Sequence, residues 1–124
     1  MNKNILFYGK SFSGKTTAII GNLKLYLEQC PNLKIGVWER YPEIKSQISE
    51  VIKVDNPYPA LVEAFDLFVV AGGIGIVEER EIITSAIHRN VPVWYEVCAS
   101  REKLEGLYKV IPCLKEFEKV ECRI

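Results

Sequence analysis

Short runs of hydrophobic residues recur along the chain at the length of β-strands. They are bounded by glycine, proline and polar residues, which is typical of strands separated by turns. The most apolar run, Leu67–Ala71, is continuous rather than alternating, so we expect it at the centre of a sheet that is covered on both faces. Strands are predicted over residues 4–8, 33–40, 67–71, 91–97 and 118–124.

Between these runs, hydrophobic residues recur every three or four positions, as they do on one face of a helix. The first helix is predicted from Ile19, Leu23, Tyr26, Leu27 and Cys30, and it ends before Pro31. A second helix, opened by Pro42 and Glu43, is predicted from Ile44, Ile48, Val51 and Ile52. Further helices are expected over residues 59–65 and 78–89, with Asn90 as a left-handed cap, and after Ser100.

Strands that alternate with helices predict an α/β fold: a three-layer α/β/α sandwich with a mainly parallel, five-stranded sheet. The length of 124 residues fits one domain, residues 1–124. In such sheets ligands bind beyond the carboxyl ends of the strands. We therefore expect the functional residues at that edge.

Charge and cysteine content narrow the classes of function. Lysine plus arginine and aspartate plus glutamate both number 16, so the chain shows no net charge for binding nucleic acid or an acidic membrane. No apolar run is long enough to span a membrane, and no secretory signal is recognisable, so we expect a cytoplasmic protein. The four cysteines form no C-x-x-C pair, which favours reduced thiols, although a Cys113–Cys122 bridge stays open.

One stretch carries a specific chemical signal. The residues are Gly9, Lys10, Ser11, Phe12, Ser13, Gly14, Lys15 and Thr16, and they fit G-x-x-x-x-G-K-[ST] between a predicted strand and a predicted helix. Gly9 and Gly14 allow a tight turn close to an anion. Lys15 can bring its ammonium to the β- and γ-phosphates, and the Thr16 hydroxyl can bind Mg²⁺. The positive end of the following helix favours an anion at the same place.

This motif resembles that of the P-loop NTPase superfamily, and the order of the elements resembles its RecA-like group. The resemblance implies a site for ATP or another nucleoside triphosphate with Mg²⁺, with Thr16 as the metal ligand. The implied nucleotide-binding residues are Gly9, Lys10, Ser11, Phe12, Ser13, Gly14, Lys15, Thr16 and Thr17.

The sequence departs from the RecA-like pattern at the strand that carries the Walker B acid in that group. The matching strand, Leu67–Ala71, is followed by Gly72 and Gly73 and has no acid at its end. Lys15 is expected to act on the phosphates. Glu39, at the end of a predicted strand, and after it Glu78, which follows the glycine turn, are the candidates for a catalytic carboxylate, because both are expected near the ligand edge.

The predicted function is binding of a magnesium–nucleotide complex with weak or partner-dependent hydrolysis. Two alternatives stay open: a small nucleotide or metabolite kinase, and a degenerate P-loop module that binds without catalysis. A protein partner or a second copy of the chain is compatible with each of these functions, and the sequence contains no recognisable base-reading motif.

Overall fold

A parallel β-sheet forms the centre of the molecule. The computed structural model describes residues 3–11 and 13–123. The strands are β1 (Ile5–Gly9), β2 (Ile35–Trp38), β3 (Ile52–Lys53), β4 (Leu67–Val70), β5 (Val93–Cys98) and β6 (Glu118–Glu121). They lie in the order β3-β2-β4-β5-β1-β6, and each neighbouring pair is parallel.

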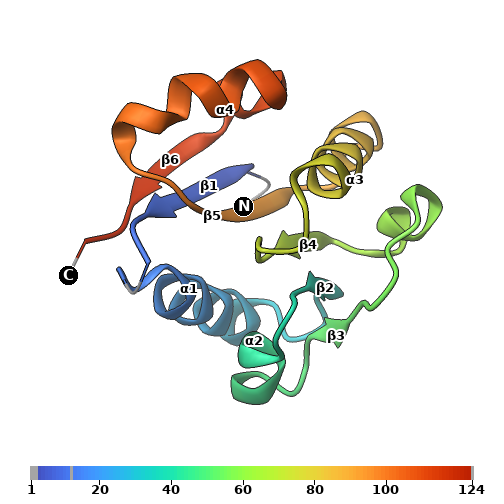
Figure 1. The fold of residues 1–124 in the computed structure, drawn as a ribbon. Coiled ribbons are helices and arrows are strands. Elements are labelled where there is room, and N and C mark those ends of the chain that lie inside the picture. Colours follow the sequence, from blue (N-terminus) through green and yellow to red (C-terminus); the bar gives the residue numbers. More distant parts are fainter. Residues whose placement is uncertain (1–2, 12, 124) are drawn as a thin grey trace.

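Helices cover both faces of this sheet. Figure 1 shows α1 (Lys15–Gln29) and α2 (Glu43–Gln47) on one face, and α3 (Ile76–His88) and α4 (Leu104–Val110) on the other. Three 3₁₀ segments complete the connections: η1 (Pro59–Ala64), η2 (Arg101–Lys103) and η3 (Pro112–Glu116). The three-layer α/β/α fold predicted from the sequence is therefore confirmed.

Successive side chains of the central strands β1, β4 and β5 enter two separate hydrophobic cores. On β5, Trp94 packs in the core under α1, and Tyr95 packs in the core under α3 and α4. β4 is buried throughout, as its apolar run predicts, and Asn90 has the expected positive φ of 59°. This alternation places every second residue of β5 on the α1 side of the sheet.

The prediction of five strands and of a helix that extends to Ile52 is wrong. α2 ends at Gln47, and Ile52 and Lys53 form the additional edge strand β3, which pairs with β2. Ile48 and Val51 are buried, but in a turn whose Val51 carbonyl accepts a 2.8 Å hydrogen bond from Lys45 Nζ. This turn buries the same apolar residues as a longer helix would.

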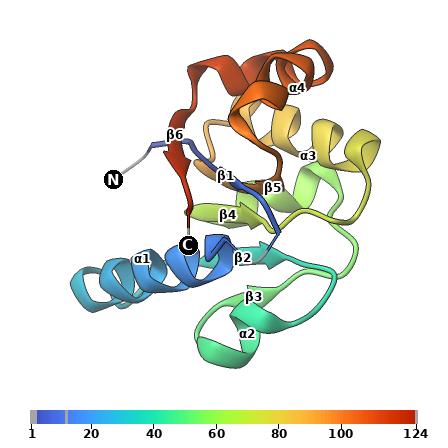
Figure 2. The same cartoon turned by 60° about the vertical axis from the view of Figure 1, so that its left-hand side comes forward.

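Strand order decides which residues meet at the ligand edge. β5 lies between β1 and β4, and the end of β6 lies close to the beginning of α1 (Figure 2).

Among the described residues, no helix is both long and apolar enough to cross a membrane.

Candidate functional site

The glycine-rich loop joins the carboxyl end of β1 to the first residue of α1. Gly14 has a φ of 84°, a left-handed conformation that favours glycine, and it directly precedes α1. A Cβ atom on Gly9 would lie 2.5 Å from both the Cys122 carbonyl oxygen and Ser13 Oγ. Both glycines of the motif are therefore required by the backbone and its packing.

Lys15 is folded over this loop rather than extended into solvent. Its side chain is buried, and Nζ donates a 2.7 Å hydrogen bond to the Lys10 carbonyl oxygen and a longer one, 3.4 Å, to Ser13 Oγ. Among the described residues Lys15 forms no ion pair with a carboxylate. A buried ammonium held by neutral oxygens is well suited to exchange these contacts for an anion.

Thr16, at the second position of α1, contacts an acid from the neighbouring strand. Its hydroxyl donates a 2.9 Å hydrogen bond to Glu96 Oε1 on β5. Burial raises the pKa of Glu96, against the opposite effects of the Thr16 hydrogen bond and the Lys15 charge. The site therefore keeps a partly desolvated carboxylate beside a hydroxyl, and oxygen ligands of this kind are those that Mg²⁺ prefers.

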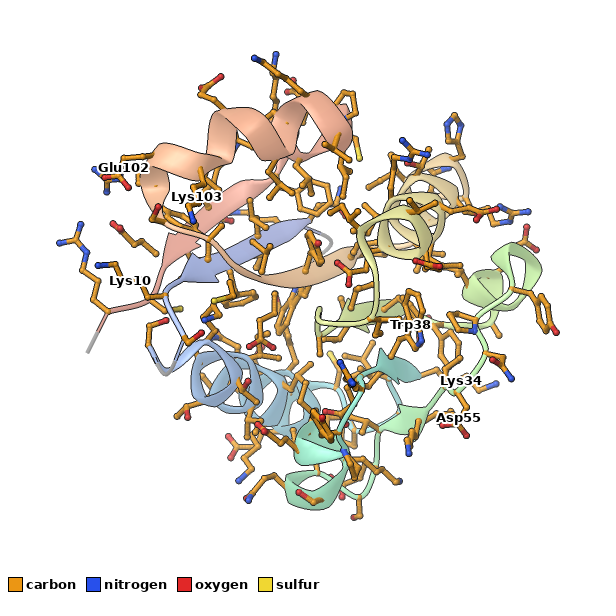
Figure 3. All side chains as sticks on the ribbon, in the orientation of Figure 1. Lys10, Lys34, Trp38, Asp55, Glu102 and Lys103 are labelled. Carbon is orange, nitrogen blue, oxygen red and sulfur yellow. The ribbon has the colours of Figure 1, made fainter. Side chains whose placement is uncertain are left out.

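Among the described residues, Ser11 and Ser13 of the loop line two cavities. One has a volume of about 600 Å³ and includes the Thr16 and Glu96 side chains. It is lined by Ser11, Ser13, Gly14, Lys15, Thr16, Thr17, Glu43, Ala71, Gly72, Gly73, Glu96 and Cys98. The other, of about 550 Å³, is lined by Gly9, Lys10, Ser11, Ser13, Ser100, Arg101, Glu102, Glu121, Cys122 and Arg123. Figure 3 shows Lys10, Glu102 and Lys103 on one side of the molecule, opposite Lys34 and Asp55. Ser11 and Ser13 belong to both linings, so the two cavities lie next to each other.

Of the two predicted catalytic acids, Glu39 lies beside the site and Glu78 does not line it. Glu39 lines a small cavity with Thr16 and Glu96, but its two carboxylate oxygens accept 3.0 Å hydrogen bonds from the backbone amides of Ile44 and Lys45. Glu78 lies with its carboxylate against Gly75, and the described residues that line the loop cavities do not include it. Phe12 lies outside the described residues.

Comparisons with known proteins support the fold. No protein-family model matches the chain, and no curated protein matches it. Among solved structures, the chain is similar to the DnaC helicase loader, with a TM-score of 0.64 and 14% identity over 98% of this chain and 79% of that one. It is also similar to AMPPCP-bound DnaA from Aquifex aeolicus, with a TM-score of 0.59 and 12% identity over 98% of this chain and 41% of that one.

The chain has a P-loop NTPase-like fold. The identities of these neighbours are low, so the likeness concerns the fold alone. Within this fold, β5 lies between the loop strand β1 and β4.

The structure gives two acids contacts that the sequence did not predict. Glu96 belongs to a predicted strand, and only the strand order brings it to Thr16. Glu79 is buried in the first turn of α3, where it accepts 3.0 Å hydrogen bonds from the amides of Ile74 and Gly75 and a third hydrogen bond from the Tyr95 hydroxyl. Glu79 therefore connects the loop after β4 to β5.

The loop after β4 approaches β5 closely at Gly72, so a side chain at this position is expected to destabilise the fold. A Cβ atom on Gly72 would lie 2.4 Å from the Glu96 carbonyl oxygen, and φ is 77°. Gly72→Ala is expected to lower the free energy of unfolding by roughly 2–4 kcal/mol, through backbone strain and the clash with that carbonyl. Urea denaturation measures this loss.

Gly73→Ala is the matched control for the clash. Gly73 also has a positive φ, of 73°, but a Cβ atom there would meet no heavy atom within 4 Å. This variant is expected to lose only about 1 kcal/mol, the cost of a left-handed alanine. Equal losses for the two variants would mean that the contact with Glu96 does not constrain the loop.

Proposed function

We propose that the chain binds a nucleoside triphosphate with Mg²⁺, with ATP as the expected nucleotide, through residues 9–17. The observation that carries this proposal is the joint placement of Lys15 and Thr16 directly after the glycine turn. Lys15 Nζ is held by the Lys10 carbonyl, and Thr16 faces a carboxylate in the same cavity. A phosphate chain needs such a cation and such a metal ligand side by side.

The first turn of α1 supports the same proposal. Amide groups in the first turn of a helix have no partner within the helix, and the helix dipole favours negative charge at this end. α1 has 15 residues and no acid of its own in its first turn, so the helix itself places no negative charge against an anion there. The triphosphate would lie across Ser13–Thr17, and Lys15 would turn from the Lys10 carbonyl to its oxygens.

The two cavities beside the loop suggest how the rest of the nucleotide would lie. The phosphates and Mg²⁺ would occupy the cavity with Lys15, Thr16 and Glu96, and the base and ribose the cavity between Lys10 and Arg101. The similarity to DnaA in its AMPPCP-bound form is compatible with this placement of an ATP-like ligand.

The residues present fit Mg²⁺ as the partner of the nucleotide. Thr16 Oγ1 and the Glu96 carboxylate are 2.9 Å apart, and hydroxyl and carboxylate oxygens suit this hard cation. Within the described residues no group of three or more histidine, cysteine, aspartate or glutamate side chains could hold a metal ion. The metal would therefore need phosphate oxygens as well, and when bound it would neutralise their charge.

Hydrolysis by the chain alone is expected to be slow. The acid of the RecA-like pattern is replaced by Ala71 and Gly72 after β4, and the Glu39 carboxylate already caps the amides of α2. Catalytic roles for Glu39 and Glu78 stay predictions. A binding module without catalysis is the second candidate, and it is favoured by the use of Glu39 as a cap. If the chain does hydrolyse the nucleotide, a partner or a second copy of the chain could supply the missing group.

Weak discrimination between bases is the prediction that tests this placement. The cavity proposed for the base is lined by charged and small side chains and by no aromatic residue among those described. We expect ATP and GTP to bind with dissociation constants within about tenfold of each other, a difference below about 1.4 kcal/mol. Calorimetric titration of both nucleotides in Mg²⁺ measures the ratio. A hundredfold preference for guanine would contradict this placement.

A further inference from the structure

We propose that Glu96 on β5 supplies the carboxylate that holds Mg²⁺ at this site, in place of an acid at the end of β4. The inference rests on the proposed function, because the metal would arrive with the nucleotide. It identifies the acid that the sequence alone does not.

The position of β5 makes this substitution possible. β5 pairs directly with the loop strand β1, with Phe7 opposite Glu96, whereas β4 is one strand further away. Trp94 lies in the core under α1, and Glu96, two residues later, lies on the same face. An acid at this position of β5 therefore reaches the first turn of α1.

The contact between Glu96 and Thr16 already brings together a carboxylate and a hydroxyl, whose oxygens are suited to Mg²⁺. Thr16 Oγ1 donates to Glu96 Oε1 at 2.9 Å, and among the described residues no other group donates a hydrogen bond to this carboxylate. Both side chains line the cavity that contains Lys15. Once Mg²⁺ is present, the Thr16 oxygen and the carboxylate can both face the cation, and no covalent bond has to form or break.

At the end of β4, Gly72 lies against β5 and has no side chain that could approach Thr16. Gly72 approaches the Glu96 carbonyl so closely that a Cβ atom would lie 2.4 Å from it. Ala71, Gly72 and Gly73 nevertheless line the cavity that contains Glu96. The packing of β4 against β5 thus excludes a larger residue at position 72 and leaves the space beside Thr16 to Glu96.

The two other acids near Thr16 are less suited. The two oxygens of Glu39 accept hydrogen bonds from the amides of Ile44 and Lys45 in the first turn of α2, and losing these bonds would uncap that helix. Glu43 lines the cavity, but it is exposed, and no hydrogen bond connects it to Thr16 among the described residues. Glu43 is therefore a suitable control, since it carries the same charge in the same cavity.

The test compares the affinity for ATP with and without Mg²⁺ in the wild type and in Glu96→Gln. The glutamine retains an acceptor for the Thr16 hydroxyl and removes the charge. Calorimetry in Mg²⁺ and in EDTA is expected to show an increase in affinity of about tenfold or more on adding Mg²⁺ to the wild type. In Glu96→Gln the increase should fall below about threefold, while affinity in EDTA stays equal or rises, because a negative charge near the phosphates is lost.

Glu43→Gln should retain the full effect of Mg²⁺. A Glu96→Gln variant that retains it as well would overturn the assignment of Glu96 and leave nucleotide binding intact. A wild type whose affinity does not respond to Mg²⁺ would also overturn it. A wild type that binds no ATP in either condition would refute the proposed function itself. Glu96→Asp, which keeps the charge but withdraws it by one methylene, should lose severalfold of the Mg²⁺ effect, and it decides the question if the glutamine variant does not fold.

Discussion

Replacing Lys15 by alanine is expected to weaken binding of ATP more than any other single change in the loop. The ammonium is buried beside the cavity, so its contact with a phosphate would be charge-assisted and partly shielded from water. The expected loss is about 2–4 kcal/mol, which is roughly a thirtyfold to several-hundredfold rise in the dissociation constant. Calorimetric titration of wild type and variant with Mg-ATP measures it.

Lys10→Ala is the control for a general loss of positive charge. The Lys10 side chain is exposed, and the contact that it makes with Lys15 uses its backbone carbonyl, which the substitution retains. We expect this variant to lose less than about 1 kcal/mol, as is usual for exposed charges. Equal affinity of wild type and Lys15→Ala, with both folded by circular dichroism, would refute the assignment of Lys15.

Replacing Glu79 by alanine is expected to cause a large loss of stability. The side chain is 4% exposed, and its carboxylate accepts hydrogen bonds from the Ile74 and Gly75 amides and from the Tyr95 hydroxyl. Burial, followed by the hydrogen bond to Glu79, raises the pKa of Tyr95, so the phenol stays a donor. Removing the shared acceptor should lower the free energy of unfolding by about 2–4 kcal/mol.

The neighbouring acid provides the comparison. Glu78→Ala removes an exposed carboxylate from the same first turn of α3 and should cost no more than about 1 kcal/mol. Tyr95→Phe removes one of the three donors and should lie between the two. Urea denaturation of all three variants would contradict this account if Glu78→Ala and Glu79→Ala were equally destabilised.

The parts of the fold that the sequence predicts are those whose pattern is local. The strand Leu67–Val70 is a continuous apolar run, and burial on both faces of the sheet requires such a run. The loop before α1 is predicted because backbone geometry and anion binding both require glycine at fixed positions. In each case the residue type follows from its immediate surroundings.

The sequence did not predict β3 because no local pattern of hydrophobic residues marks this strand. Ile52 and Lys53 are both exposed, and the strand exists only because the turn before it returns the chain to the edge of β2. Ile44, Ile48 and Val51 have helical spacing, yet only Ile44 lies in a helix. All three residues are apolar because they are buried under the sheet. Their spacing alone does not distinguish a turn from a helix.

The roles of Glu79 and Glu96 depend on contacts between distant segments. An acid in the first turn of a helix is commonly a partner of the helix dipole, and this reading describes Glu78 but not Glu79. Glu79 is distinguished only by Tyr95, and Glu96 only by Thr16, 80 positions away in the chain. The order of strands determines both contacts, and the sequence prediction did not specify that order in detail.

Titration of the wild-type chain with AMPPCP and Mg²⁺, followed by amide NMR, tests the central proposal most directly. We expect a saturable response with one nucleotide per chain. The largest shift changes should fall on the amides of residues 9–17 and on Glu96, and smaller ones on Arg101 to Glu102. No response at millimolar nucleotide, or a saturable response away from the loop between β1 and α1, would contradict it.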